Sequence, residues 1–317
     1  IGLVAQVAHR YLSLREIDER SALARQTIAS RAETFRIYTR RVEVGASSRL
    51  NLTQVQTLLT QAQALGAQLE LARAAEFNAL TLLVGAPIDL PPLAGQLDAQ
   101  LSLTALCPGL PSDLLVQRPD IVAAEHRLQA ANANIGAARA AFFPRIALTA
   151  SAGTASAELG GLFASGSLAW IFAPTITLPI FDAGRRRHDL DLAEVRRDLA
   201  VAAYEKTVQG AFRDVADALA ARLWLAEQVT IARTALTTQR ERAHLSQLRY
   251  DHGAAAYLDV LDAQRDLLAA EQQLVQTRRA LLDSQVNLYA ALGGGTPEVA
   301  PLPCHRPPAP NRETSPP

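Results

Sequence analysis

The side chains that could perform chemistry are scattered along this sequence rather than gathered into a motif. The six histidines are widely separated, and none lies in an HExxH pattern or beside a pair of cysteines. The run Gly293-Gly294-Gly295 follows an expected helix, where a glycine cap and linker are more common than a phosphate loop. Neither a GxSxG motif nor a Walker loop occurs. The sequence therefore predicts no enzyme, no cofactor and no metal site.

Two carboxylates, Asp259 and Asp262, lie three residues apart, and on a helix this spacing puts both on one face. Near the start of a helix such charges complement the helix dipole, which is the alternative interpretation of this pair. Cys107 and Cys304 are far apart in sequence and fit no metal or redox spacing. Whether these two cysteines pair with each other stays open.

A long internal repeat supplies the elements that position these residues. A shift of 208 positions aligns pairs of identical residues, among them Arg41 with Arg249 and Gly45 with Gly253. Each copy has the pattern of a helix, a glycine turn and a second helix. We therefore expect residues 1–85 and 209–294 to be two versions of one helical hairpin.

The return helix of the second copy carries a heptad pattern. Large apolar residues recur every seven positions, at Val260, Leu267, Leu274, Leu281 and Leu288. A companion seam of small residues includes Ala263, Ala270 and Ala291. Large residues on one seam and small ones on the other allow helices to approach closely. Arg265, Gln272 and Arg279 are expected to mark the solvated side.

The helix before the second turn is expected to be very long. From Gly184 to Tyr250 there is no proline, and Gly210 is the only interior glycine. At 1.5 Å per residue, ~67 residues would span about 100 Å. Such a length predicts an elongated helical hairpin whose apolar seams require partner helices.

Between the two repeats, the sequence changes to the alternation of a β-hairpin. Apolar residues occupy every second position around 146–152 and again around 170–180. Strands of ~10–12 residues are typical of transmembrane barrels, so Trp170, Phe172, Ile176 and Leu178 are expected to face lipid. The alternative is the edge hairpin of a soluble sheet, with the aromatic rings in an ordinary core. Pro174 argues against an interior strand.

The amino-acid composition limits the classes of protein to which this chain can belong. The chain has 317 residues, of which 49% are hydrophobic and 20% charged, so it can bury a core. Its formal net charge is zero, which does not favour nucleic acid as a partner. No apolar run reaches the ~18 residues of a membrane-spanning helix.

Four segments carry a resemblance to a known family. They are Gly109–Ile121 (GLPSDLLVQRPDI), Ala131–Pro144 (ANANIGAARAAFFP), Leu178–Phe181 (LPIF) and Asn287–Gly293 (NLYAALG). In this order and spacing they closely resemble the outer membrane factor family of tripartite efflux pumps, the TolC/OprM-like channels and NodT-type lipoproteins. The resemblance covers essentially residues 1–295.

The resemblance implies a mainly α fold with long antiparallel helical hairpins. Each protomer of a homotrimer would contribute them to a periplasmic α-barrel, and its β-hairpin to a transmembrane β-barrel. Such a channel lies in the bacterial outer membrane, surrounded by its lipid, and extends into the periplasm. It joins a periplasmic adaptor (membrane fusion) protein and an inner-membrane transporter, and passively exports drugs or other small molecules.

The resemblance also implies domain boundaries. These are 1–85 for a first periplasmic hairpin, 86–118 for an equatorial connecting region, 119–144 for a helix leading to the barrel, 145–181 for the transmembrane β-hairpin, 182–294 for the second periplasmic hairpin and 295–317 for a Pro-rich tail. The chain begins inside the helix after the family's first β-hairpin, so we expect an N-terminally truncated channel. Three copies of one hairpin give 3 × 2 = 6 strands, fewer than the ~8 of the smallest membrane barrels. This polypeptide alone is therefore not expected to close a pore.

Site residues are carried over from the family position by position. The turns correspond to the periplasmic tips where the adaptor docks, at Arg41, Gly45, Arg249, Tyr250 and Gly253. Asp262, and less closely Asp259, match the acidic residues that constrict family channels; in a trimer each would form a ring of three carboxylates that favours cations. Ala254-Ala255-Ala256 stands where some members carry a basic partner.

The sequence leaves several interpretations open. The run Arg185-Arg186-Arg187 fits either a barrel rim near anionic lipid headgroups or a solvated helix start. Within the family, the nearest alternative function is a type I protein-secretion channel. A soluble coiled-coil scaffold is the alternative from a different class, and it leaves the alternation of residues 146–180 unexplained.

Overall fold

The computed structural model describes residues 1–91, 115–116 and 118–294. Cys107, Cys304, most of the expected connecting region and the Pro-rich tail lie outside these residues. The described residues fall into two compact units, one drawn from residues 1–118 and 211–317 and the other from 119–210. Helix α6 (Arg185–Asp251) contributes to both units, and Gly210 is the only glycine inside it, as the sequence predicted.

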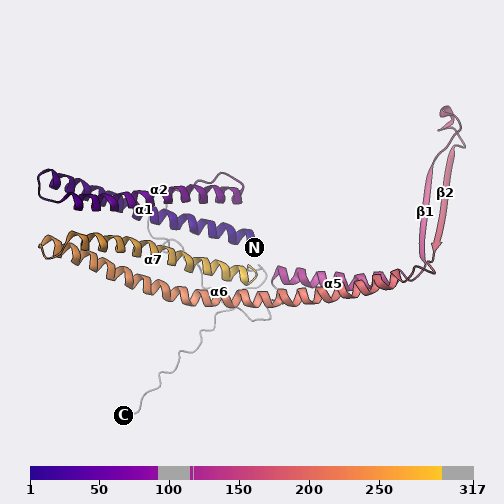
Figure 1. Cartoon of the computed structure of the whole chain (residues 1–317). Coiled ribbons are helices and arrows are strands. Elements are labelled where there is room, and N and C mark those ends of the chain that lie inside the picture. The colour runs from indigo at the N-terminus through magenta and orange to yellow at the C-terminus, as the bar shows by residue number, and fades with distance from the viewer. Residues whose placement is uncertain (92–114, 117, 295–317) are drawn as a thin grey trace, which may run out of the picture. The chain divides into compact units, whose positions relative to one another are not determined.

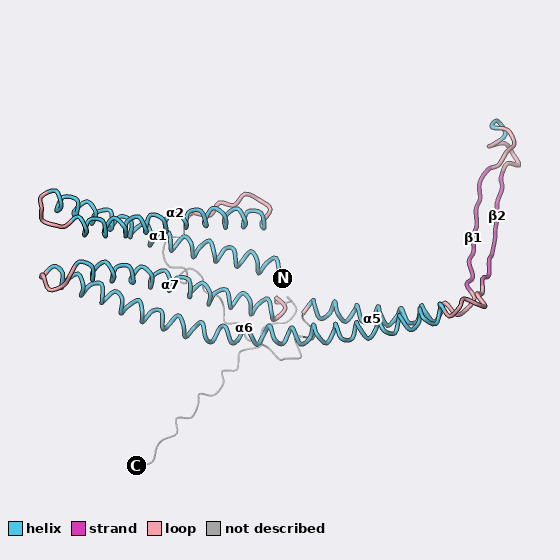
Figure 2. The backbone as a smooth tube through the Cα atoms, in the orientation of Figure 1, coloured by secondary structure: helices cyan, strands magenta, loops and turns pink. Residues whose placement is uncertain are grey.

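The first unit consists of two helical hairpins. Helices α1 (Gly2–Glu43) and α2 (Arg49–Val84) form one, and the later part of α6 forms the other with α7 (Tyr257–Ala291). The helices of each hairpin run antiparallel (Figure 1), and their turns lie at the same end of the unit (Figure 2). The predicted duplicated hairpin is therefore confirmed.

Local chemistry explains where these helices begin and end. The Ser48 hydroxyl accepts a hydrogen bond of 3.1 Å from the backbone N–H of Asn51 and so caps the start of α2. Gly85 adopts the left-handed conformation that ends α2, and Pro87 follows. Ala256, at the corresponding start of α7, makes no side-chain cap.

The core of this unit is a set of small apolar clusters placed along the helix seams. One lies between α1 and α2 and contains Ile17, Ala24 and Leu69. Another joins α6 to α7 through Val229, Leu236 and Leu274. Val260, Leu274 and Leu288 of the predicted heptad are buried. The seams therefore pack as the heptad pattern indicates.

The prediction that one side of α7 faces solvent is wrong at Gln272. Gln272 is only 8% exposed, and its side-chain oxygen accepts a hydrogen bond of 2.5 Å from Arg20 Nε on α1. Arg279 on the same side forms an ion pair of 3.1 Å with Glu16 of α1. This side of α7 is polar because it faces the polar side of α1. Helical periodicity alone does not distinguish such an interface from solvent.

The second unit contains α5 (Pro119–Ala140), strands β1 (Arg145–Thr154) and β2 (Leu168–Thr177), and the start of α6. Pro119 occupies the first position of α5, where its missing N–H costs no hydrogen bond. Pro144 follows the end of α5. Because the next residue opens β1, the chain changes from helical to extended over four residues.

The two strands pair antiparallel, with Ile146 opposite Ile176 and Ala152 opposite Trp170. Opposite residues in such a pair share a face, so the predicted alternation is confirmed. Pro174 lies inside β2 opposite Leu148, which the sheet tolerates because β1 is the only described partner of β2. Since β2 ends at Thr177, Leu178 lies one residue beyond the strand on which we expected it.

Candidate functional sites: two hairpin tips and one β-hairpin face

The two hairpin tips share one backbone design. Gly45 and Gly253 both have positive φ, at 74° and 71°. In the first tip, the N–H of Ala46 donates to the carbonyl of Arg41 at 2.7 Å; in the second, the N–H of Ala254 donates to that of Arg249 at 2.8 Å. These four residues stand 208 positions apart in pairs. The sequence repeat is therefore also a repeat of turn geometry.

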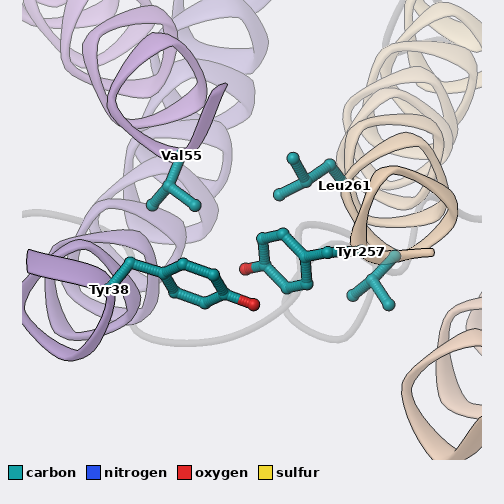
Figure 3. Close-up of a cluster of buried hydrophobic side chains, with 5 residues drawn as sticks. Tyr38, Val55, Tyr257 and Leu261 are labelled. Atoms are coloured by element: carbon teal, nitrogen blue, oxygen red, sulfur yellow. The ribbon is translucent and has the colours of Figure 1, made fainter. Parts of the chain in front are cut away.

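Three tyrosines gather where the two tips meet. The hydroxyls of Tyr38 on α1 and Tyr250 on α6 share a hydrogen bond of 2.6 Å. Tyr257 of α7 stacks on Tyr38 with ring centroids 4.4 Å apart. Figure 3 shows the two side chains pointing toward each other from α1 and α7. Val55 and Leu261 belong to the same buried cluster. The tyrosines thus join the first hairpin to the second.

Arg41 completes this tyrosine cluster. One guanidinium nitrogen donates a hydrogen bond of 3.1 Å to the Tyr250 hydroxyl, and the guanidinium carbon lies 5.3 Å from the centre of the Tyr38 ring. Two of the residues that we expected at the docking tips are therefore in direct contact. Arg249 instead donates to the carbonyl of Ala254 in its own turn, at 3.3 Å.

Burial raises the pKa of two tyrosines in this cluster. It raises the pKa of Tyr38 far above its usual range, helped by the hydrogen bond to Tyr250. Burial also raises the pKa of Tyr257 to about 12, and nearby Tyr250 adds to the effect. Sequence reasoning missed Tyr38 and Tyr257. An aromatic residue within two turns of each tip glycine was the available signal.

The paired aspartates line a groove between α6 and α7 near the second tip. The groove has a volume of about 910 Å³, and Glu241, Arg242 and Arg249 contribute to its walls. Asp259 and Asp262 both face it, in agreement with their spacing. Asp262 forms an ion pair of 3.2 Å with Arg265, one turn further along α7. A basic partner thus lies after Asp262, although none follows the tip glycine.

At the wall of the groove, Arg242 forms an ion pair that links α6 to α7. A nitrogen of the Arg242 guanidinium lies 2.6 Å from an Asp266 carboxylate oxygen. The hydrogen bond from Arg242 holds the pKa of Asp266 below its usual value. Asp266 therefore stays ionised, and it holds the two helices together beside the aspartate pair.

One face of the β-hairpin is apolar and uncovered. Trp170, Phe172 and Ile176 lie on this face, and their exposed fractions are 72%, 57% and 70%. Ile146 and Leu148 of β1 lie on the same face and are similarly exposed to solvent. The other face carries mainly Ala, Thr, Ser and Gly, with Ile171 and, at the start of β1, Arg145 as the exceptions. Within the described residues, nothing buries the aromatic side chains, which does not fit an ordinary core.

The described residues contain no group of three or more His, Cys, Asp or Glu side chains arranged to hold a metal ion. None of their helices combines the length and the apolar character needed to cross a membrane.

A duplicated helical hairpin joined to a β-hairpin with one apolar face defines the protomer fold of outer-membrane α-barrel channels. The chain belongs to the outer membrane efflux protein family, which it matches over residues 1–86 and 110–294. This confirms the resemblance that the four sequence segments indicated.

Individual relatives agree with this assignment. The chain is 49% identical over 305 residues to the toluene efflux pump outer membrane protein TtgF of Pseudomonas putida, covering 96% of this chain and 63% of TtgF. It is 46% identical over 309 residues to the outer membrane protein OprJ of Pseudomonas aeruginosa, covering 96% of this chain and 64% of OprJ. The chain thus spans less than two thirds of the length of these relatives.

Solved structures show the same fold. The open state of the MtrE outer membrane channel of Neisseria gonorrhoeae superimposes with a TM-score of 0.78 at 42% identity, over 93% of this chain and 66% of MtrE. A membrane protein from Pseudomonas aeruginosa superimposes with a TM-score of 0.82 at 45% identity, over 92% of this chain and 68% of that protein.

Proposed function

We propose that this chain belongs to the outer-membrane channel subunit of a tripartite efflux system. The subunit would act as a passive duct that carries drugs or other small molecules through the periplasm and outer membrane. It would perform no catalysis, because the energy would come from an inner-membrane transporter. The names of TtgF and its relatives, which describe outer membrane proteins of efflux pumps, support this function.

The observation that carries the proposal is the β-hairpin, which has one exposed apolar face and one face of mainly small and hydroxyl side chains. Each strand has 10 residues, which is the length that crosses a bilayer core when a strand is tilted. Leaving large apolar side chains such as Trp170 in water on one face is unfavourable, by about 25 cal/mol per Å² of apolar surface. A barrel wall removes this cost, because lipid covers the apolar face while small and hydroxyl side chains face the lumen.

The helical hairpins support the proposed assembly. Large apolar side chains stay open to solvent along α2 and α6, including Leu71 at 74%, Leu82 at 83% and Leu223 at 65%. Two further copies of the chain, packed side by side in an α-barrel, would cover such positions. The paired tips, with Arg41, Gly45, Arg249, Tyr250 and Gly253, would then form the end of the barrel that meets the periplasmic adaptor.

Within that barrel, the aspartates would form the constriction. Asp262 and Asp259 share one groove-facing side of α7, so a trimer would carry two stacked rings of carboxylates. Such rings favour cations and add an electrostatic barrier to anions. The ion pair of Asp262 with Arg265 would limit this charge, because it neutralises part of the ring.

A chimera tests the proposed function. This chain would replace the matching 305-residue segment of TtgF in a Pseudomonas putida strain that lacks its own TtgF. The expected result is restored exclusion of labelled toluene, because the duct supplies a path while the pump selects the cargo. A matched chimera without residues 145–177 should stay inactive, since it lacks the hairpin. A full chimera that assembles in the outer membrane yet leaves toluene accumulation unchanged would contradict the proposal.

A further inference from the structure

Three consecutive arginines open α6, and the middle one has a structural role at the base of the β-hairpin. Arg186 donates hydrogen bonds of 2.6 Å to the Asp182 carboxylate and 2.6 Å to the carbonyl of Pro179. It also reaches the carbonyl of Ala141 at 3.4 Å, and its guanidinium lies over the ring of Phe142. Arg186 thereby ties the end of α5, the exit of β2 and the start of α6 together.

The two flanking arginines have no such role. The Arg185 side chain is 83% exposed, and its ion pair with Asp189 is long at 3.8 Å. Arg187 is exposed and makes no ion pair or side-chain hydrogen bond with a described residue. Both lie at a helix N-terminus, where the helix dipole disfavours positive charge. Contacts within this unit do not explain why these two positions carry cations.

Large apolar side chains are exposed in the two segments that connect the strands to α5 and α6, at the end of the hairpin where Arg185 and Arg187 lie. Phe143 precedes β1 and is 69% exposed, whereas Ile180 and Phe181 follow β2 and are 92% and 88% exposed. All three belong to the short segments that join the strands to the helices. In membrane barrels, aromatic residues flank the apolar band at the level where the membrane meets water.

The charge of the β-hairpin differs between its two ends. The loop that joins the strands, residues 155–167, contains one charged residue, Glu158, and no cation. The opposite end carries Arg145 at the start of β1 and the three arginines that open α6, together with the Asp182 carboxylate that pairs with Arg186. Because each 10-residue strand crosses the bilayer core, this opposite end lies at headgroup level in the proposed channel. The cations therefore mark a single leaflet.

We propose that Arg185 and Arg187, together with Phe143, Ile180 and Phe181, form a binding surface for the phosphate headgroups of anionic phospholipid. The arginines attract the phosphates while the apolar side chains enter the region between headgroups and acyl chains. This inference rests on the proposed function, since it requires that the hairpin enters a membrane. It adds a preference for lipid charge at one end of the hairpin.

Vesicle flotation of the full 317-residue chain tests this surface. The probes are vesicles of phosphatidylcholine alone and vesicles of an equal mixture with phosphatidylglycerol, each at low and high salt. We expect binding to both, with tighter binding to the anionic vesicles at low salt. R185Q/R187Q should weaken binding to the anionic vesicles roughly 30-fold, since each basic side chain near such a surface contributes about 1 kcal/mol. Its binding to neutral vesicles should be unchanged.

Two control variants make the result specific. R127Q/R196Q removes two exposed arginines from α5 and α6 of the same unit and should retain the anionic preference. R185K/R187K preserves the charge and should also retain it. An anionic preference that survives in R185Q/R187Q, or that is missing from the unaltered chain, overturns the inference while the proposed function stands. A chain that binds neither type of vesicle contradicts both.

Discussion

The hydroxyl groups of Tyr38 and Tyr250 share a hydrogen bond of 2.6 Å although the two residues are 212 positions apart in the sequence. Tyr38 belongs to the first copy of the repeat and Tyr250 to the second, so the bond links the two hairpins near their tips. Because Tyr38 is only 3% exposed, water does not readily replace a lost partner. The pair is therefore a measurable part of the stability of this unit.

The first prediction concerns this tyrosine pair. Y38F should lower the free energy of unfolding by about 1 kcal/mol, the net contribution of one hydrogen bond. Y250F should cost more, because it also loses the bond from Arg41 and leaves the Tyr38 hydroxyl buried without that partner. Denaturant unfolding followed by circular dichroism measures both values. Y204F is the control at a partly exposed tyrosine of α6, and a Y38F value no larger than that of Y204F would exclude the expected role.

The second prediction is a loss of stability at high pH. The pKa of Tyr257 is about 12 in the folded chain, against an ordinary value of about 10. Between these values the unfolded chain releases the proton more readily than the folded chain. Stability should therefore be fully present below pH ~10 and fall as the pH rises toward 12, by up to about 1.4 kcal/mol per pH unit for each such tyrosine. Unfolding free energies measured from pH 9 upward should flatten in Y257F; an unaltered slope would refute this origin.

The third prediction concerns the exposed apolar face of the β-hairpin. Trp170 and Trp224 are the two tryptophans of the chain, so W224F leaves Trp170 as the sole tryptophan. Its fluorescence should shift to shorter wavelength on addition of phosphatidylcholine vesicles and be quenched by brominated acyl chains. W170F is the matched control, because it leaves Trp224, which is 59% exposed but lies on α6 in the first unit, away from the β-hairpin in sequence. Equal quenching in the two variants would show that the apolar hairpin face does not enter lipid selectively.

The fourth prediction tests the proposed constriction. In the TtgF chimera, D262A should raise single-channel conductance and reduce the preference for cations, because one ring of carboxylates is lost. D198A removes an exposed carboxylate from α6 in the other unit and should change neither property. Planar-bilayer recordings measure both. If D262A conducts like the parent chimera, the gate role of Asp262 is wrong and its charge serves the helix or Arg265.

The fifth prediction compares the same substitution, glycine to alanine, at two positions with different backbone conformations. G253A should destabilise the chain by about 1 kcal/mol, because a side chain strains the positive φ of 71° although no atom blocks the added Cβ. G210A should instead stabilise α6 by about 1 kcal/mol, since it also meets open space but lies within a helix. Thermal unfolding compares them directly. The same sign for both would mean that backbone conformation does not decide the outcome.

Much of this architecture was predictable because it depends on local rules. The absence of proline predicted α6, the tip glycines predicted both turns, and alternation predicted the β-hairpin. These features depend on neighbouring residues only. The four family segments then predicted the family, although Gly109–Ile121 lies largely outside the described residues.

The remainder depends on contacts between distant segments. Gln272 was expected in solvent because its own helix cannot show that Arg20 covers it. Tyr38 and Tyr257 were missed because they meet across the two copies of the repeat, where no spacing rule applies. Leu178 was placed on β2 because alternation continues past Thr177, although the pairing with β1 stops there.

The two tips secure the start of their second helices in different ways. The Ser48 hydroxyl caps the first turn of α2, whereas α7 follows Ala256 with no side-chain cap. The first turn of α7 is held instead by Tyr257, which is 7% exposed and stacks on Tyr38 of α1. Asp259 lies on this turn. The position of this carboxylate therefore depends on the contact between the two copies of the repeat, and not on α7 alone.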